Sequence, residues 1–205
     1  TRYQEVTGVQ TCALPLWERC IEIILNYLKK NDIIVSTTGK TSRELNEISK
    51  KNKFQNPLFY TIGGMGHSSQ IALGISNFSS ERVFCFDGDG SIIMHMGSLG
   101  IIGGNSSGNY FHILFNNGTH ESVGGQPTIG KDINFKYLSE SLGYKKYFEI
   151  SSENKLIDLF KNLPTSIESP FFIEIKIDSS SRLDLGRPED SPLEQKRNFQ
   201  KKISD

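Results

Sequence analysis

The sequence of 205 residues contains no apolar run near the roughly 20 residues that a membrane-spanning helix needs. Its 23 basic and 23 acidic residues cancel, so the composition indicates neither a nucleic acid nor a membrane surface as partner. Three cysteines, Cys12, Cys20 and Cys85, lack metal-binding spacing and cannot all pair, which argues against a disulfide framework and for reduced thiols in the cytoplasm. With 36% hydrophobic residues and no internal repeat, the sequence predicts one ordinary globular domain.

From Leu16 onward, short apolar runs typical of buried strands alternate with segments of helical periodicity. This alternation predicts an α/β fold with a mostly parallel, doubly wound sheet and helices on both faces. The expected strands are 32–35, 58–61, 83–86, 111–115, 146–149 and 171–177. The expected helices are 17–30, 42–51, 67–78, one helix from Ser91 to about Gly103, 132–143, 153–163 and a last one from about 193.

Polar residues follow two of these strands at the point where each strand ends. Gly88-Asp89-Gly90 follows the strand 83–86, and Asn116-Asn117 follows the strand 111–115. The carboxyl ends of parallel strands are where open α/β sheets bind ligands. Carboxylate and amide oxygens suit Mg²⁺, and the bare N–H groups at the start of the helix after Gly90 suit a phosphate. The pattern therefore predicts a site for a magnesium-bridged phosphate ester or anhydride.

Other interpretations of the same stretch are weaker. A lone Gly-Asp-Gly is most often a simple turn. An EF-hand loop that uses Asp87 and Asp89 would put Cys85 first and Met96 last, where a bidentate Glu is required. A phosphatase with Asp87 as nucleophile would have its motif after the first strand of the domain, whereas about eighty residues with their own strands precede it here.

The spacing of the two polar motifs resembles the signature of thiamine diphosphate enzymes. Gly88-Asp89-Gly90 is followed by 25 residues and then by Asn116-Asn117. The resemblance implies that Asp89, the side chain of Asn117 and the main-chain carbonyl of Thr119 bind Mg²⁺, which holds the diphosphate of the cofactor. It also implies that Gly88, Gly90 and Ser91 lie against the cofactor.

Four further segments narrow the resemblance, namely residues 35–45, 64–67, 117–128 and 181–188. Together they resemble the phosphonopyruvate decarboxylase family over nearly all of residues 17–205. The resemblance implies that residues 16–205 form the diphosphate-binding domain only. The pyrimidine-binding domain would come from a missing N-terminal half or from a separate subunit, and the full-length enzyme would be a homo-oligomer.

The activity that the resemblance implies is decarboxylation of 3-phosphonopyruvate to phosphonoacetaldehyde and CO₂ in phosphonate biosynthesis, with the thiazolium ring as electron sink. The glutamate that activates the cofactor in this family belongs to the pyrimidine-binding domain, so we expect no turnover by this chain alone. Two other interpretations stay open. The chain could be the diphosphate-binding subunit of a sulfopyruvate decarboxylase or of another 2-oxo acid decarboxylase, or a non-catalytic remnant that binds cofactor and only pairs with a partner.

The resemblance assigns further cofactor contacts to two strand-end loops. Met65 would be the bulky wedge that bends the cofactor, and the Gly63 carbonyl would accept a hydrogen bond from its aminopyrimidine. On the residues alone, Met65 between glycines is better interpreted as a core residue. The other residues expected against the cofactor are Thr38, Gly39, Thr41 and Gly64.

Two cations are candidates for binding the substrate phosphonate. Lys40 and Arg43 flank a turn after the first strand, where a lysine and an arginine are otherwise usually solvated. Beside an anionic cofactor and a dianionic substrate tail, phosphonate binding becomes as plausible as a surface role. Glu121, Arg182 and Arg187 lie near the expected site without a feature that fixes their role.

The four histidines divide into two kinds. His67 and His120 lie in strand-end loops, where they could carry protons near neutral pH. His95 and His112 lie within apolar helix and strand patterns, which favours a structural role.

Residues 6–15 resemble, residue for residue, the translation of a common sequencing adapter. We therefore expect residues 1–15 to be a non-native segment with few contacts to the core, and the domain to start at Leu16.

Overall fold

The computed structural model describes residues 14–163, 170–178 and 185–204. Within them a six-stranded sheet has the order β2-β1-β3-β4-β8-β7, and each neighbouring pair is parallel. The predicted α/β fold with a parallel sheet is therefore confirmed. In chain order the strands of this sheet are β1 (Ile33–Ser36), β2 (Leu58–Tyr60), β3 (Val83–Gly88), β4 (Tyr110–Asn116), β7 (Lys146–Ile150) and β8 (Phe171–Lys176).

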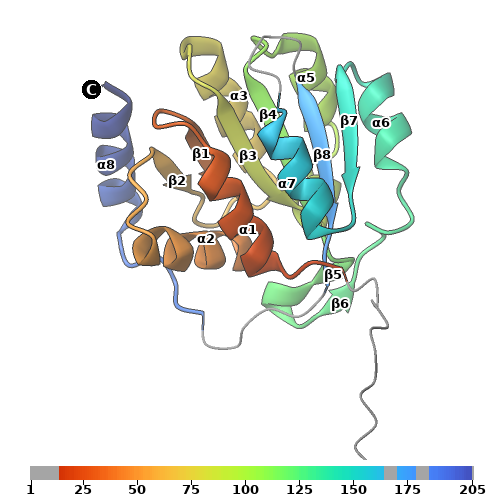
Figure 1. Ribbon diagram of the computed structural model, residues 1–205, viewed down its shortest axis with the longest axis horizontal. Helices are drawn as coiled ribbons and strands as arrows, with labels where there is room; N and C mark the ends of the chain where they lie inside the picture. Colours follow the sequence, from red (N-terminus) through yellow and green to blue (C-terminus); the bar gives the residue numbers. More distant parts are fainter. Residues whose placement is uncertain (1–13, 164–169, 179–184, 205) are drawn as a thin grey trace, which may run out of the picture.

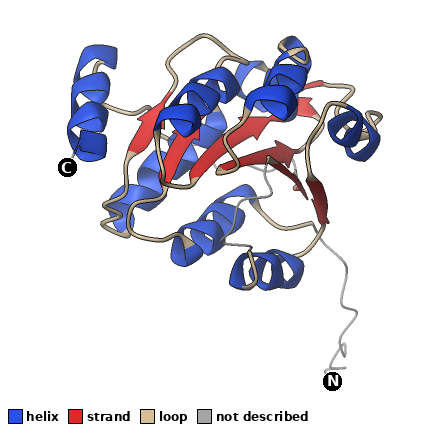
Figure 2. Ribbon diagram, turned by 90° about the horizontal axis from the view of Figure 1, so that it is seen from above, coloured by secondary structure: helices blue, strands red, loops and turns tan. Residues whose placement is uncertain are grey.

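Helices cover both faces of the sheet, as Figure 2 shows from above. One face packs against α1 (Trp17–Tyr27), α2 (Lys40–Lys51) and α7 (Glu153–Lys161). The other face packs against α3 (Ser68–Phe78), α4 (Asp89–Met94), α5 (Ser98–Asn105) and α6 (Phe135–Ser141), and α8 (Pro192–Ser204) packs beside β2. The sheet is apolar on both faces because side chains alternate along each strand: Phe111, Ile113 and Phe115 of β4 face α1 and α7, whereas Tyr110 and Leu114 lie on the face covered by α3 and α4.

The single helix expected from Ser91 to Gly103 is wrong, because the chain forms two helices there. Helix α4 ends at Met94 and α5 begins at Ser98. His95 leaves helical geometry with φ −129° and ψ 46°, and Gly97, which has low helix propensity, lies at the turn into α5. His95 is therefore exposed between two helices instead of lying within one.

The glycine-rich stretch after β4 forms a small hairpin that the periodicity did not predict. It consists of β5 (Thr119–His120), the short 3₁₀ helix η1 (Glu121–Val123) and β6 (Gln126–Pro127). Gly118 and Gly124 have φ of +72° and +123°, backbone angles that glycine adopts without steric cost, so the chain can reverse twice in ten residues. Figure 1 shows the hairpin at one end of the sheet, next to the residues that follow β4.

The N-terminal segment and one C-terminal motif fall partly outside the described residues. The first thirteen residues of the expected adapter-derived segment lie outside them, and so does Arg182. Pro15 is buried, and its carbonyl accepts a hydrogen bond from the Asp178 N–H at 3.4 Å, so core contacts reach one residue beyond the expected start at Leu16. Arg187 is exposed. No helix in the described part of the chain is long and apolar enough to cross a bilayer.

The order of the strands fixes where a ligand can bind. The chain runs from β1 to β2 in one direction and from β3 to β4 in the other, although β1 and β3 are neighbours. The loops after β1 and β3 therefore diverge and leave a crevice between them at the carboxyl edge of the sheet.

Candidate active site

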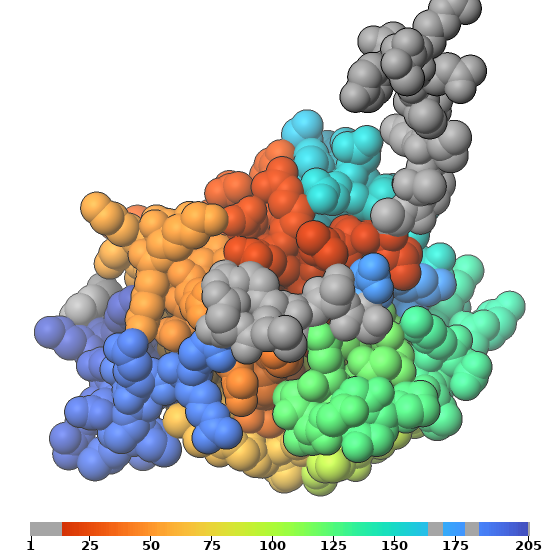
Figure 3. All heavy atoms as spheres, turned by 90° about the horizontal axis from the view of Figure 1, so that it is seen from below, coloured from red at the N-terminus to blue at the C-terminus, as the bar shows by residue number. Residues whose placement is uncertain are grey.

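A cavity of about 60 Å³ lies at this crevice. Its walls come from five separate segments of the chain. Each segment except the α1 residue follows a strand or lies in the hairpin. Figure 3 looks onto this end of the molecule, where the hairpin residues (green) form much of the visible face. The lining residues are Trp17, Thr37, Thr38, Lys40, Thr41, Met65, Gly88, Asp89, Gly90, Ser91, Thr119, His120, Glu121 and Ser122. The structure thus brings together most of the residues predicted for the diphosphate and the cation.

Asp89 is the first residue of α4 and is only 2% exposed. Burial raises the pKa of its carboxyl group, while a short hydrogen bond from the Thr128 hydroxyl and one from the Gly90 N–H lower it. A buried carboxylate of this kind is costly unless positive charge compensates it. The carboxylate is therefore a candidate ligand for a cation at the rim of the sheet.

Asn117 and Thr119 face the same side of the hairpin. The Thr119 N–H donates to Asn117 Oδ1 at 3.0 Å, and Asn117 Nδ2 donates to Glu121 Oε2 at 3.0 Å, which fixes the orientation of the amide. The Thr128 N–H bonds to the Gly118 carbonyl, so in the antiparallel ladder Thr119 is a position whose N–H and C=O both point away from β6. The carbonyl of Thr119 therefore lies on the side of the Asn117 amide oxygen. Asn117 itself does not line the cavity but is bonded to Glu121, which does.

Two glycines allow close packing around Asp89. A Cβ at Gly90 would lie 2.5 Å from the His120 ring and 3.3 Å from Met65 Cε, so both side chains pack onto the first turn of α4. A Cβ at Gly130 would lie 2.6 Å from Asp89 Oδ2 and 3.0 Å from Asn116 Oδ1. A larger residue at either position would fill the space next to the carboxylate.

A second cavity of about 230 Å³ is lined by Gly63, Gly64 and His67. Within it His67 Nδ1 lies 3.1 Å from the Gly64 carbonyl oxygen, and its ring meets that of His95 edge-on with centroids 4.3 Å apart. The predicted cofactor residues therefore divide between two cavities. His120 lies in the first and His67 in the second.

The two candidate phosphonate residues also separate. Lys40 is the first residue of α2 and lines the first cavity, whereas Arg43 is half-buried and does not line it. Gly39, predicted as a cofactor contact, precedes the helix with φ +98°, and a Cβ there would lie 3.2 Å from Ser122 Oγ. The turn before α2 thus packs directly onto the hairpin.

Sequence reasoning missed three lining residues, namely Trp17, Thr37 and Ser122. Thr37 Oγ1 and Ser91 Oγ lie 2.9 Å apart, which joins the loop after β1 to the first turn of α4. The position of Thr37 directly after a strand could have suggested it. Nothing in the pattern marks Trp17, whose indole reaches the cavity only because α1 packs across the sheet and stacks on Phe115.

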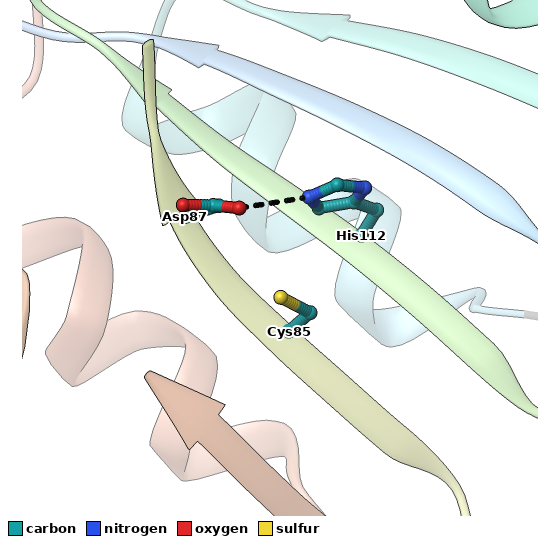
Figure 4. A group of neighbouring side chains, drawn as sticks. All are labelled: Cys85, Asp87 and His112. Carbon is teal, nitrogen blue, oxygen red and sulfur yellow. Dashed lines mark hydrogen bonds and ion pairs between the residues drawn. The ribbon is translucent and has the colours of Figure 1, made fainter. Parts of the chain in front are cut away.

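Beneath this site Cys85, Asp87 and His112 form a buried group whose ligand atoms lie within 4.8 Å of one another (Figure 4). Asp87 Oδ2 lies 3.4 Å from His112 Nε2, and His112 Nδ1 lies 2.8 Å from the Tyr144 hydroxyl. Asp87 Oδ1 accepts the N–H of Gly88 at 3.0 Å. These hydrogen bonds hold the turn that carries Asp89, and they agree with the structural role expected for His112.

Burial raises the pKa of the Cys85 thiol well above its usual range. The thiol is therefore neutral. Because metals bind the thiolate form of cysteine, this group is better described as an enclosed polar network than as a metal site.

Residues 37–175 match the family model described as "Thiamine pyrophosphate enzyme, C-terminal TPP binding domain". The chain belongs to this family. Among curated relatives, the chain is 33% identical to the phosphonopyruvate decarboxylase of Streptomyces viridochromogenes over 192 residues, which are 93% of this chain and 47% of the relative. It is also 33% identical to the phosphonopyruvate decarboxylase of Streptomyces hygroscopicus over 189 residues, 91% of this chain and 45% of the relative.

A shorter match joins the chain to a subunit of a related enzyme. The chain is 36% identical to the sulfopyruvate decarboxylase subunit beta of Methanocaldococcus jannaschii over 124 residues, 60% of this chain and 64% of the subunit. The chain thus spans about half the length of the two Streptomyces relatives and a larger share of the subunit.

The described residues fit the diphosphate end of thiamine pyrophosphate. The cavity is lined by the first turn of α4, where the helix dipole favours an anion. Two buried polar atoms on lining residues, Thr119 Oγ1 and Trp17 Nε1, have no hydrogen-bond partner within the described part of the chain. The carboxylate of Asp89, the amide oxygen of Asn117 and the Thr119 carbonyl are oxygen donors of the kind that Mg²⁺ prefers, and they would hold the cation.

Proposed function

We propose that this chain is the diphosphate-binding part of a thiamine-pyrophosphate-dependent decarboxylase that converts 3-phosphonopyruvate to phosphonoacetaldehyde and CO₂. The observation that carries the proposal is that Lys40 and the buried Asp89 line the same cavity at the switch point of the sheet. The names of the two Streptomyces relatives, which match over nine tenths of this chain, support it.

In this proposal the cofactor residues divide by the part of the cofactor that they contact. Asp89, Asn117 and the Thr119 carbonyl would hold Mg²⁺, and the cofactor when bound would supply an electron sink for the departing CO₂. Met65 and Gly63 would contact its ring systems. Around the diphosphate would lie Thr38, Gly39, Thr41, Gly88, Gly90 and Ser91, with Gly64 beside Gly63.

His120 is the better placed of the two candidate proton carriers. Its ring packs on Gly90 inside the first cavity, directly above the start of α4. His67 lies in the second cavity, beside Gly64, and would act at the other end of the cofactor. Proton transfer by a positioned histidine is a common element of catalysis.

Lys40 is the stronger candidate for the substrate phosphonate. Its ammonium group adds a charge to the N-terminus of α2, where the helix dipole already favours an anion. Arg43 lies one turn further along the same helix and would contribute from outside the cavity. The length of the match, 192 residues for the phosphonopyruvate enzyme against 124 for the sulfopyruvate subunit, favours phosphonate over sulfonate.

We also propose that the chain acts with a pyrimidine-binding partner, either a further part of the same polypeptide or a second subunit, and that the complete enzyme is a homo-oligomer. The relatives support this, since two are about twice as long as the matched region and a third is named as a subunit. The buried, free thiols of Cys20 and Cys85 are in keeping with a cytoplasmic enzyme.

The test measures binding first and turnover second. Thiamine pyrophosphate and Mg²⁺ are titrated into the 205-residue chain while the fluorescence of Trp17, its single tryptophan, is followed. The chain is then combined with the N-terminal half of the Streptomyces viridochromogenes relative, and CO₂ release is measured from phosphonopyruvate, sulfopyruvate and pyruvate. Release that is fastest from phosphonopyruvate and absent in Asp89→Ala is the expected result. Cofactor binding without CO₂ from any of the three acids would favour the non-catalytic interpretation.

A further inference from the structure

Thr128 has no role in the cofactor signature, yet it touches the proposed cation ligand. The hairpin returns the chain over α4, and the Thr128 N–H donates to the Gly118 carbonyl at 2.9 Å. Its hydroxyl donates to Asp89 Oδ2 and accepts the N–H of Gly130 at 3.0 Å. The hydroxyl is therefore fixed on both sides, and its proton is directed at one carboxylate oxygen.

That oxygen is also enclosed by backbone. A Cβ on Gly130 would lie 2.6 Å from Asp89 Oδ2 and 2.7 Å from Asp89 Cβ, so the glycine itself lies against this side of the carboxylate. The Thr128 hydroxyl and Gly130 both lie against Oδ2, and within the described residues no side chain donates to Oδ1, so Oδ1 is the oxygen more open to a cation. The Asp89 carboxylate can then bind a cation through one oxygen and not through two.

The turn that carries Thr128 is anchored in the sheet. Asn116 Nδ2 donates to the Gly130 carbonyl at 2.9 Å and to Glu174 Oε1 at 2.7 Å. Glu174 is buried and accepts a further hydrogen bond from the Tyr147 hydroxyl at 2.5 Å. The turn is thereby tied to β4, β7 and β8, and it can resist a cation that would pull the carboxylate into another orientation.

We propose that Thr128 makes this site selective for Mg²⁺ over Ca²⁺ by holding Asp89 in one-oxygen coordination. Mg²⁺ requires a near-octahedral shell at about 2.0–2.1 Å and takes carboxylates through single oxygens, whereas Ca²⁺ takes six to eight oxygens at about 2.3–2.6 Å and readily uses both oxygens of a carboxylate. Asp89 is the only carboxylate among the proposed ligands, so its coordination mode is the main difference that the two ions meet. This inference rests on the proposed function, because it concerns the cation of the same site.

The experiment compares cation affinities instead of activity. Mg²⁺ and Ca²⁺ are titrated separately into the 205-residue chain with saturating thiamine pyrophosphate, followed by calorimetry and by Trp17 fluorescence. Thr128→Val removes the hydroxyl at nearly constant shape, and Thr128→Ser retains it. Gln126→Ala, an exposed change in the same hairpin, is the matched control.

The expected result is that wild type, Thr128→Ser and Gln126→Ala prefer Mg²⁺, while Thr128→Val loses about tenfold or more of the preference, mainly through tighter Ca²⁺ binding. An unchanged ratio in Thr128→Val with intact Mg²⁺ binding would overturn the role of Thr128 and leave the proposed function standing. Equal weakening of both ions, with a lower melting temperature, would overturn it too and reduce Thr128 to support of the fold. No cation binding by wild type would remove the proposed site itself.

Discussion

Replacing Asp87 by alanine should destabilise the fold and leave the proposed cation ligands in place. Replacing its near neighbour Asp89 should remove a proposed cation ligand without destabilising the fold. Asp87 is 1% exposed and accepts from Gly88 N–H at 3.0 Å, with His112 Nε2 at 3.4 Å. Its removal leaves the buried His112 Nε2 and the half-buried Gly88 N–H without this partner, at a cost of about 1–3 kcal/mol each. For a domain of this size each kcal/mol lowers Tm by about 2–4 °C, so Asp87→Ala should lower Tm by about 4–24 °C.

Asp89→Asn keeps the shape of the side chain and removes its charge. Because burial raises the pKa of Asp89 in the folded chain above its ordinary value of 3.8, the folded chain binds this proton more tightly than the unfolded chain. The protonated carboxyl group therefore favours folding and the ionised carboxylate opposes it. The stabilisation is complete below pH 3.8 and is lost as the pH rises through the raised pKa. At neutral pH without a cation, Asp89→Asn should leave Tm unchanged or raise it.

The assay is thermal unfolding at neutral pH with and without Mg²⁺ and thiamine pyrophosphate. Ligand at a hundred times its Kd stabilises by about 2.7 kcal/mol, which is a rise of about 5–11 °C in wild type. The rise should persist in Asp87→Ala, from a lower baseline, and vanish in Asp89→Asn. An Asp87→Ala variant as stable as wild type, or an Asp89→Asn variant as unstable as Asp87→Ala, would refute the division of roles between the two aspartates.

Three further predictions concern the substrate, the packing on α4 and the N-terminal segment. In the assembled enzyme Lys40→Ala should lower kcat/KM for phosphonopyruvate about 10- to 150-fold and more than for pyruvate, with a smaller loss in Arg43→Ala; equal losses on both substrates would assign Lys40 to the cofactor diphosphate. Gly90→Ala should displace the His120 ring and weaken cofactor binding in calorimetry. Gly104→Ala, whose Cβ meets nothing within 4 Å, should bind the cofactor as wild type does. Equal affinities of the two variants would count against the packing of His120 on Gly90. Deleting residues 1–13 should leave Tm unchanged in calorimetry, and a clear drop would argue against an adapter origin.

The fold and the main site segments could be predicted because they depend on local patterns. Strand runs such as 83–86 and the glycines around Asp89 carry their information within a few residues, so each expected strand appears within a few residues of its predicted bounds. The break at His95 was missed because apolar periodicity does not reveal where a single residue leaves helical geometry. The hairpin at Thr119 was missed because its strands have only two residues, too few to show an alternating pattern. The contact of Thr128 with Asp89 joins residues 39 positions apart, and only the folded chain defines it.

The two edges of the sheet differ in how they discourage pairing with another chain. An exposed edge strand can template intermolecular β-structure, and short length, charge and cover by a helix each reduce this hazard. Strand β7 carries the exposed Lys146 and Glu149, the latter paired with Lys176 at 2.7 Å. Strand β2 has only three residues and no charge, and it depends on α8, which packs on it with Phe199 against Phe59 at 5.4 Å. A chain that ended before α8 would uncover Phe59 and the β2 edge together, so the last helix protects the protein from self-association as well as completing its core.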